Sequence, residues 1–339
     1  MEEFALIRAL AHRFAGKPSR VVRGIGDDAA VIAATTPAWW HVTTDLLAEG
    51  VHFDLRTASP ESVGYRAAMA NLSDIAAMGA IPRYLLISLA IPSGFRQKHT
   101  FSLYTGLMKA CRPHGVALIG GDTSASRSGL FINITLIGTT ASGLALFRHG
   151  ARVGDHIYVT GTLGDSLAGL QLLEQSSSKG SARHSASPFR PAHRRFLMQR
   201  HLRPSARIKE GQWLNNARLA TAAIDLSDGL SGDLRHLCEE SRVGAEIELD
   251  KLPLSAACRI YAEHRCIQPA QLALTGGEDY ELLFTAHPAT RSNIERQARA
   301  RGFHVTCIGI VRPHRFGIRM KTGDGTVRPM PLTSYEHFR

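Results

Sequence analysis

Features of a secreted, disulfide-stabilised or membrane-spanning protein are absent from this sequence. Its 339 residues include only five cysteines, an odd number at wide spacing with no C-x-x-C pair, so neither a disulfide framework nor a zinc site is expected. We interpret the cysteines as small buried apolar residues. The longest apolar stretches, such as residues 84–92, fall short of the roughly 20 residues that span a bilayer. The first residues lack the cationic start and apolar core of a signal peptide, so we expect a cytoplasmic protein with no membrane partner.

Acidic residues are also scarce. The chain has 29 Asp and Glu against 40 Lys and Arg, a formal net charge of +11. Its 44% hydrophobic and 20% charged content is typical of a globular chain that can build a core, and its length suggests two domains at roughly 150 residues each. A basic surface can serve nucleic acid, phosphorylated ligands or solubility alone. The charge balance by itself does not choose among these.

Half of the 14 aspartates lie in five short segments rich in glycine and hydroxyl residues, which we predict to be turn-like. These aspartates are Asp27, Asp28, Asp45, Asp74, Asp122, Asp225 and Asp228. Any one segment is explained as well by a turn or a helix cap. Five of them in a basic chain favour a shared role, because carboxylates brought together need cations to compensate their charge. Metal-bridged polyphosphate is the ligand that fits best.

Hydrophobic periodicity predicts a mixed α/β chain of two domains, with the site in the cleft between them. We expect helices at 4–14, 59–78, 100–112, 165–175, 205–214, 230–240 and 289–301. We expect strands at 31–33, 40–44, 83–91, 116–119, 130–138, 156–160, 221–224, 245–249, 281–286 and 303–310. A boundary loop at 148–155 divides an N-terminal ATP- and metal-binding, dimerising domain (1–147) from a C-terminal α/β domain (148–339). The Ser-, His- and Arg-rich stretch 176–195 is predicted to be a mobile loop.

The familiar phosphate-binding motifs are missing. No G-x-x-x-x-G-K-[ST] loop occurs, and no H-R-D or D-F-G set of a protein kinase. The positive charge that compensates bound phosphate groups would come mainly from metal ions held by aspartates, supplemented by an arginine such as Arg148. The order of residues reveals no Ser/His/Asp or Cys/His arrangement of a catalytic site. His52 is a candidate site residue only because it follows Asp45 by seven residues.

Ten ordered motifs give the sequence a family resemblance that covers almost the whole chain. They are G-I-G-D-D-A-A-V at 24–31, T-T-D at 43–45, G-V-H-F at 50–53, N-L-S-D-I-A-A-M-G-A at 71–80, G-G-D-T-S at 120–124, G-D-H-I-Y-V-T-G-T-L-G-D-S at 154–166, H-L-R-P at 201–204, I-D-L-S-D-G-L at 224–230, G-G-E-D-Y-E-L at 276–282 and S-Y-E-H-F at 334–338. In this order they resemble the thiamine-monophosphate kinases. These enzymes belong to a superfamily that also contains aminoimidazole ribonucleotide synthetase and selenophosphate synthetase.

The resemblance implies site residues and an assembly. Metal ligands would be Asp28, Thr43, Thr44, Asp45, Asp74, Asp122, Asp225 and Asp228. ATP contacts would be Tyr104, Gly121, Asp122, Arg148 and Ser227. Substrate contacts would be His52, Glu278 and Tyr335, although a strand-end cap and a packing aromatic explain the last two equally well from sequence. The family fold implies a homodimer whose N-terminal domains meet in a β-barrel-like contact.

The implied activity is ATP-dependent phosphorylation of thiamine monophosphate to thiamine diphosphate, the final step of thiamine diphosphate biosynthesis. Our mechanistic hypothesis is direct in-line transfer without a covalent catalytic residue, with several Mg²⁺ ions bridging the phosphates. A phosphate monoester has a second pKa near about 6, so the nucleophile needs no dedicated general base. Whether K⁺ is also required stays open.

Two alternatives remain at this point. The first is another ATP-dependent synthetase of the same superfamily, most similar to aminoimidazole ribonucleotide synthetase. Selenophosphate synthetase is disfavoured because it needs a reactive N-terminal Cys or selenocysteine, and the first cysteine here is Cys111. The second is a basic RNA-binding protein that uses residues 176–195. That stretch lacks the interleaved aromatics of RNA-binding modules, so we do not expect a nucleic-acid partner.

Overall fold

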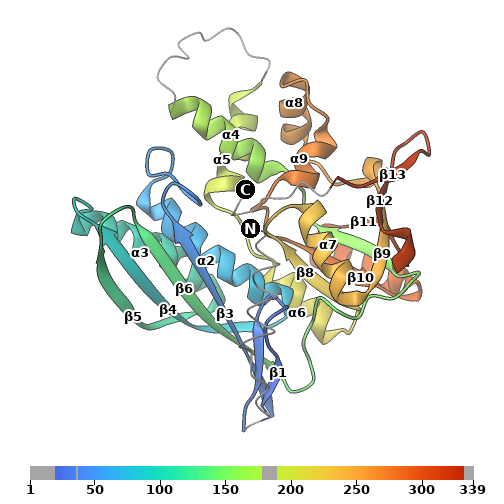
Figure 1. The fold of residues 1–339 in the computed structure, drawn as a ribbon, viewed down its shortest axis with the longest axis horizontal. Helices are drawn as coiled ribbons and strands as arrows, with labels where there is room; N and C mark the ends of the chain where they lie inside the picture. Colours follow the sequence, from blue (N-terminus) through green and yellow to red (C-terminus); the bar gives the residue numbers. More distant parts are fainter. Residues whose placement is uncertain (1–19, 36, 178–188, 332–339) are drawn as a thin grey trace.

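The computed structural model describes residues 20–35, 37–177 and 189–331. The predicted helix at 4–14 and the predicted contact Tyr335 lie outside the described residues, as does most of the predicted loop at 176–195. The remaining chain forms two sheets, each with its own helices (Figure 1).

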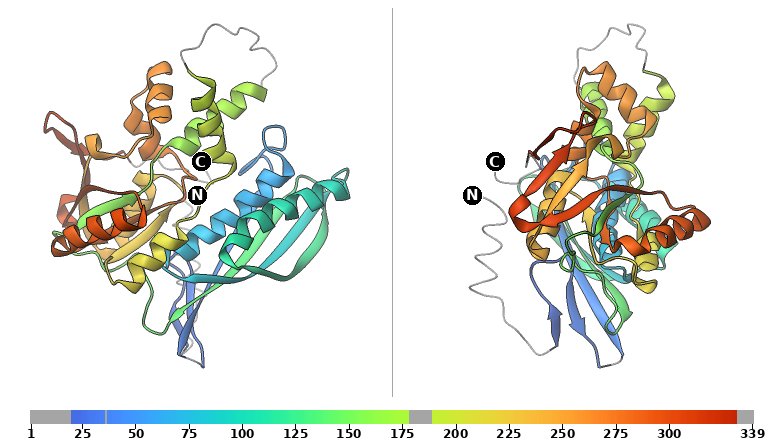
Figure 2. Two further views of the ribbon diagram at one scale, coloured as in Figure 1. Left: turned by 180° about the vertical axis from the view of Figure 1, so that it is seen from behind. Right: turned by 90° about the vertical axis from the view of Figure 1, so that its right-hand side faces the viewer.

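The N-terminal half is a six-stranded sheet covered by two helices on one face. Its strands are β1 (Val21–Arg23), β2 (Ala30–Ala33), β3 (Ala38–Ala48), β4 (Ile81–Pro92), β5 (Ala117–Ser126) and β6 (Phe131–Ala141), and their order in the sheet is β1-β2-β3-β6-β4-β5. The helices are α2 (Pro60–Ala77) and α3 (Gln97–Cys111), followed by the short turn η1 (Arg112–His114). Seen from behind, α2 and α3 lie side by side in front of the sheet (Figure 2).

Helix α2 begins and ends where local sequence signals place it. The Ser59 hydroxyl accepts a hydrogen bond from the Ser62 amide (3.2 Å), and Pro60 occupies the first helical position. Gly79 follows the helix in a left-handed conformation (φ 65°), which glycine adopts without a steric cost. The predicted helix at 59–78 is therefore confirmed.

Within the described residues, no helix covers the face of the first sheet opposite α2 and α3. Strand β6 points Ile132, Ile134 and Leu136 inward, where they are fully buried. On the outer face, large apolar side chains are exposed, including Leu46 (56%) and Ile119 (55%). Strand β5 at the sheet edge is exposed along nearly its whole length. The described part of the chain thus leaves apolar side chains of this sheet surface uncovered, which is typical of an interaction surface.

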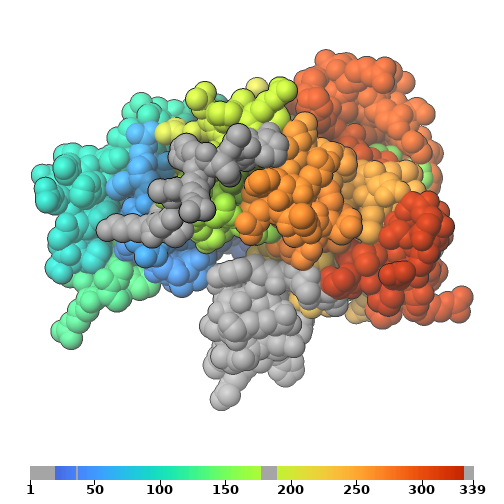
Figure 3. Space-filling view, turned by 90° about the horizontal axis from the view of Figure 1, so that it is seen from above, coloured from blue at the N-terminus to red at the C-terminus, as the bar shows by residue number. Residues whose placement is uncertain are grey.

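The C-terminal half is a seven-stranded sheet with the order β13-β12-β9-β11-β7-β10-β8. Its strands are β7 (His156–Thr160), β8 (Ala222–Leu226), β9 (Val243–Glu248), β10 (Glu281–Ala286), β11 (Val305–Pro313), β12 (Ile318–Lys321) and β13 (Val327–Pro329). Its helices are α4 (Asp165–Ser177), α5 (Pro191–Leu202), α6 (Ile208–Asn216), α7 (Leu230–Ser241), α8 (Ala256–His264), α9 (Pro269–Thr275) and α10 (Arg291–Arg301), with short turns η2 (Leu249–Lys251), η3 (Pro288–Thr290) and η4 (His314–Phe316). From above, the yellow-green and orange helices lie between the teal and red parts of the chain (Figure 3).

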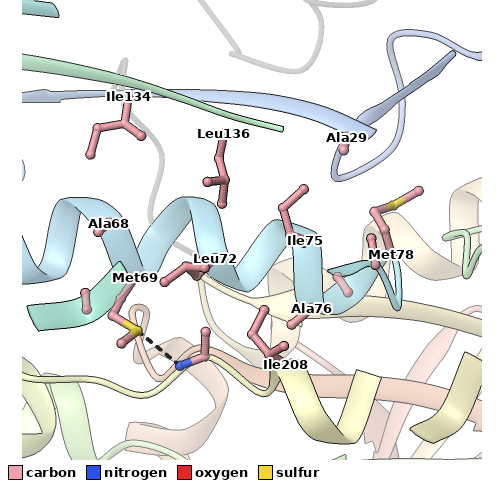
Figure 4. Close-up of a cluster of buried hydrophobic side chains, with 14 of the residues drawn as sticks. Ala29, Ala68, Met69, Leu72, Ile75, Ala76, Met78, Ile134, Leu136 and Ile208 are labelled. Atoms are coloured by element: carbon pink, nitrogen blue, oxygen red, sulfur yellow. Dashed lines mark hydrogen bonds between the residues drawn. The ribbon is translucent and has the colours of Figure 1, made fainter. Parts of the chain in front are cut away.

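Helix α2 is packed between the two halves. Ile134 and Leu136 of β6 lie on one side of it and Ile208 of α6 on the other (Figure 4). The contact with α6 is so close that a Cβ atom at Gly211 would lie 2.0 Å from the Ala76 carbonyl oxygen. Burial of both faces explains why α2 is rich in alanine, and it fixes the helix as the element shared by the two domains.

Several sequence predictions need correction. The stretch predicted as a loop up to residue 195 already forms α5 from Pro191, because proline suits the first helical turn and Leu197 packs against α4 at Gly169. Helices α8 and α9 and strands β12 and β13 were not predicted. Cys266 is exposed, although all five cysteines were predicted to be buried. Among the helices within the described residues, none combines the length and apolarity needed to cross a membrane.

Candidate active site

Three predicted metal ligands converge where the domains meet. Asp28 comes from the loop between β1 and β2, Asp74 from the last turn of α2, and Asp225 from the edge strand β8. One carboxylate oxygen of each lies within 4.8 Å of the others. Asp28 and Asp225 are buried and Asp74 is half-buried, so the three carboxyl groups share an environment with little water.

Burial and mutual repulsion raise the pKa values of Asp225, Asp74 and Asp45. Burial, followed by the charge of Asp28, raises the pKa of Asp225 to about 8. Burial and the charges of Asp45 and Asp225 raise the pKa of Asp74 well above its ordinary value. Burial and the charges of Asp228 and Asp28 raise the pKa of Asp45 to about 6. Asp45 and Asp228 therefore belong to the same electrostatic cluster, which favours a bound cation.

Hydrogen bonds hold the cluster in shape. The Ser73 hydroxyl donates to Asp225 (2.6 Å), and the Thr43 hydroxyl donates to Asp74. The buried carboxylate of Asp233 accepts from the backbone amides of Asp228 (3.2 Å) and the next residue (3.1 Å). These contacts tie α2, β3 and the loop after β8 into one site.

The donor set fits a hard divalent cation. Asp28 Oδ2 is buried and has no hydrogen-bond partner within the described part of the chain. Carboxylate and hydroxyl oxygens are the ligands that Mg²⁺ and Ca²⁺ take in proteins, and these ions bind less readily to nitrogen or sulfur. An unpartnered buried carboxylate oxygen beside two further carboxylates is a suitable position for such an ion.

Arg148 supplies positive charge beside the acids. Its guanidinium donates to Asp28 Oδ1 through Nη2 (2.6 Å) and Nε (3.2 Å), and its backbone amide donates to the buried Asp27 (3.3 Å). Burial disfavours the charged guanidinium, but Asp28 and Asp27 raise the pKa of Arg148, which stays charged. Burial and the charge of Asp28 raise the pKa of Asp27 to about 7. Ser227 follows Asp225 by two residues, and its carbonyl accepts from the amide of Glu278 (2.7 Å).

A second polar group lies further along α2. The Glu278 carboxylate accepts from the Arg66 guanidinium (2.5 Å), which also donates to the His52 carbonyl (3.2 Å). His52 Nδ1 accepts from the Ala48 amide (3.0 Å). Burial favours protonated Glu278, but the Arg66 charge lowers the pKa of this carboxyl below its ordinary value, so Glu278 is anionic. The two predicted substrate residues, Glu278 and His52, are thus brought together.

The single chain leaves other predicted residues apart from the cluster. Thr44 follows Thr43 on β3, so the pleat turns its side chain to the outer face, where it contacts Asn133 and Thr135. Gly121 and Asp122 lie on the exposed edge strand β5, three strands from β3, or about 14 Å away at about 4.8 Å per strand.

Tyr104 is also distant from the acids. It lies on α3 beside the start of α2, because Gly106 of α3 contacts the Glu61 carbonyl. Asp74 is near the other end of α2, about 13 residues beyond Glu61, and therefore about 20 Å away along the helix axis.

Three aspartates from the segments predicted to be turn-like lie inside strands: Asp45 in β3, Asp122 in β5 and Asp225 in β8. Asp74 lies in α2, within the helix predicted at 59–78. The segment at 120–124 was predicted to be turn-like, but β5 continues through it because β4 pairs with it in parallel, with Ile87 opposite Gly121. A Cβ atom at Gly121 would lie 1.8 Å from the Ile87 carbonyl oxygen, so glycine is required there by close packing of the strands.

Comparisons with known proteins identify the family. Residues 26–140 match the family model "AIR synthase related protein, N-terminal domain", and residues 152–321 match the C-terminal domain of the same family. The thiamine-monophosphate kinases of Haemophilus influenzae and Escherichia coli are each 38% identical, over 100% and 99% of this chain and 98% of each relative. The chain belongs to the thiamine-monophosphate kinase family.

Solved structures agree with this assignment. The structure of AaThiL complexed with AMPPCP and TMP matches with a TM-score of 0.84 and 36% identity, over 99% of this chain and 97% of the other. Thiamine-monophosphate kinase from Stenotrophomonas maltophilia matches with a TM-score of 0.75 and 33% identity, over 95% of each chain. The mixed α/β, two-domain architecture is therefore that of the family.

Three residues of the candidate site were not predicted from the sequence as site residues. They are Arg66, Ser73 and Asp233, each of which touches a predicted ligand or its backbone. Arg66 is a charged residue in an otherwise apolar stretch of α2, and that isolated charge was the available signal. Asp233 lies in the first turn of α7, where an acid is ordinarily read only as a helix cap.

Proposed function

We propose that this chain phosphorylates thiamine monophosphate to thiamine diphosphate with ATP, in the final step of thiamine diphosphate biosynthesis. The observation that supports this most directly is the convergence of Asp28, Asp74 and Asp225 at the domain boundary of a chain that matches AaThiL over its full length. AaThiL was solved with AMPPCP and TMP, a nucleotide analogue and a phosphorylated partner. Its two ligands correspond to the two substrates proposed here.

Mg²⁺ would be held by Asp28, Asp74 and Asp225, with Asp45 and Asp228 beside them. Bound there, Mg²⁺ neutralises phosphate oxygens and lets two polyanions approach each other. Arg148 stays charged and offsets part of the remaining negative charge. We propose no general base, because the terminal phosphate of the acceptor is already anionic at neutral pH, with a second pKa of about 6.

The part of the site around Glu278 is anionic and therefore favours a cationic group of the substrate. Thiamine has a positively charged thiazolium ring and an aminopyrimidine, and the anionic Glu278 suits both as a charge partner or a hydrogen-bond acceptor. The His52 carbonyl accepts from the same Arg66 nitrogen that donates to Glu278. Tyr335 stays a proposed contact outside the described residues. The RNA-binding alternative gains no support, since residues 191–195 belong to α5 and 178–188 lie outside the described residues.

We further propose a homodimer, with domains divided at 147/148. The open face of the first sheet exposes apolar side chains along β3, β4 and β5, and a second copy of this surface would cover them in a barrel-like contact. Thr44, Gly121 and Asp122 lie on this same open face or edge. Their proposed roles in metal and ATP binding therefore require the partner subunit to complete the site.

The deciding experiment incubates the protein with ATP, Mg²⁺ and thiamine monophosphate and separates the products by chromatography. Thiamine diphosphate and ADP should form in equal amounts. Asp74→Asn preserves the shape of the side chain and should lower kcat by about 100-fold or more. Absence of thiamine diphosphate with the wild-type protein, or normal turnover by the Asp74→Asn variant, contradicts the proposal. Aminoimidazole ribonucleotide synthetase substrates serve as the control for the sibling activity.

A further inference from the structure

Helix α2 reaches the C-terminal domain through two polar residues on the same face. Arg66 and Ser73 are seven residues apart, and at 100° per residue seven steps return to within about 20° of the same direction. Arg66 contacts Glu278, and Ser73 contacts Asp225. The two contacts are separated by about 10 Å along the helix axis. One rigid helix therefore connects the proposed substrate end of the site to the acid cluster.

Arg66 is positioned to orient Glu278 and the backbone at His52, not to take part in the reaction itself. Its side chain is only 2% exposed, and its Nη2 atom contacts both Glu278 and the His52 carbonyl. His201 also approaches Glu278, at 3.5 Å, but burial lowers the pKa of His201 to about 4, so it is neutral near pH 7. Arg66 thus supplies the positive charge for a half-buried carboxylate, whose side chain is 29% exposed. Removing Arg66 leaves this partly desolvated carboxylate without that charge, which is unfavourable.

The backbone that carries Glu278 is held under strain. Glu278 (φ 61°) and Tyr280 (φ 51°) both adopt the left-handed conformation that residues other than glycine rarely take. Their amides donate to the Ser227 carbonyl (2.7 Å) and the Leu226 carbonyl (2.9 Å). The loop is therefore fastened to the end of β8 next to Asp225. Such a conformation persists only where its surroundings impose it, and Arg66 contacts the end of the Glu278 side chain.

We propose that Arg66 is a positioning residue that sets the orientation of Glu278 and of the His52 turn, and thereby holds the thiamine end of the substrate at a fixed distance from the acid cluster. This inference rests on the proposed function. It predicts a selective defect, because Arg66 contacts Glu278 and His52, whereas the acid cluster is held separately by Ser73. Loss of Arg66 should weaken recognition of thiamine monophosphate and leave recognition of ATP intact.

The test compares Arg66→Gln and Arg66→Lys with the wild-type protein in steady-state kinetics. Arg66→Gln should raise KM for thiamine monophosphate by about 10- to 100-fold, with KM for ATP changed less than about twofold. Arg66→Lys should recover part of the loss, because it keeps the charge but not the planar fork of donors. The matched control is Arg203→Gln, which removes another ion pair between the C-terminal domain and α2, with Glu61 (2.6 Å), and should leave both KM values near the wild-type values.

Either of two kinetic results with Arg66→Gln would overturn the proposal: equal rises in KM for both substrates, or wild-type values of KM and kcat. If Arg66→Gln does not fold, the same kinetic comparison is made with Arg66→Lys and Glu278→Gln. Both variants should raise KM for thiamine monophosphate and leave KM for ATP nearly unchanged. Thermal shift with Mg²⁺ and an ATP analogue, and separately with thiamine monophosphate, gives a readout without turnover. If the wild-type protein neither reacts with thiamine monophosphate nor is stabilised by it, the proposed function is refuted. If the wild-type protein is active but the Arg66 variants show no rise in KM for thiamine monophosphate, or a rise in KM for ATP alone, the role of Arg66 is refuted.

Discussion

Replacing Asp74 with Asn should stabilise the protein in the absence of divalent metal ions, although it removes catalysis. In the native protein the Asp74 carboxylate lies within 4.8 Å of the carboxylates of Asp28 and Asp225. Two unit charges at that distance repel by about 3 kcal/mol at an effective dielectric constant of about 20. Attraction from Arg148 offsets part of this repulsion. At pH 8.5, where more of these carboxyl groups are ionised, we therefore expect the substitution to stabilise the metal-free fold by about 2 kcal/mol, which raises Tm by about 3–6 °C.

The sign of the pH dependence follows from the raised pKa values. The pKa of Asp225 is about 8 and that of Asp45 about 6, both above the value of about 4 for an unfolded aspartate. The folded protein therefore binds protons more tightly than the unfolded chain. This contribution to stability is complete below about pH 4 and is lost as the pH rises towards 8. The advantage of Asp74→Asn should accordingly be small at pH 5 and largest at pH 8.5.

Calorimetric unfolding with EDTA and then with Mg²⁺ measures both effects. Wild-type protein should gain about 2.7 kcal/mol at Mg²⁺ concentrations about 100 times Kd, whereas the variant should gain much less. Asp250→Asn, which removes an exposed aspartate of η2, is the control and should change Tm little. The reasoning is refuted if Asp74→Asn is less stable than wild type in EDTA at pH 8.5, or if Mg²⁺ stabilises both proteins equally.

Two other predictions concern Arg148 and the subunit contact. Arg148→Gln should lower kcat/KM for ATP by about 100-fold, with a smaller loss in Arg148→Lys, and steady-state kinetics with varied ATP would show whether the charge matters. If Asp122 completes the site of the partner subunit, an equal mixture of refolded Asp74→Asn and Asp122→Asn chains should regain about a quarter of wild-type activity, because half the dimers then hold one intact site. Mixtures no more active than either variant alone would place Asp122 in its own subunit's site or outside it.

Local signals predicted the elements that depend on local chemistry. Strands β7 and β10 were predicted at their observed bounds, since short apolar, β-branched runs between turn residues indicate buried strands. Helix α2 was predicted within a residue of each end from its cap and Gly79. Helix α5 was missed because its polar, arginine-rich sequence has little periodicity, and packing of Leu197 against α4 decides that it is helical.

The amino-acid sequence by itself determined the chemical inventory of this protein: its scarce aspartates, their order along the chain, and through that order its family. Only the tertiary structure decided which of them meet. Asp28, Asp74 and Asp225 converge because α2 is packed between two sheets, and the pleat of β3 directs Thr43, but not Thr44, towards them. The link from Arg66 to Glu278 joins residues more than 200 positions apart. Such contacts depend on long-range packing, for which local sequence carries no periodic signal.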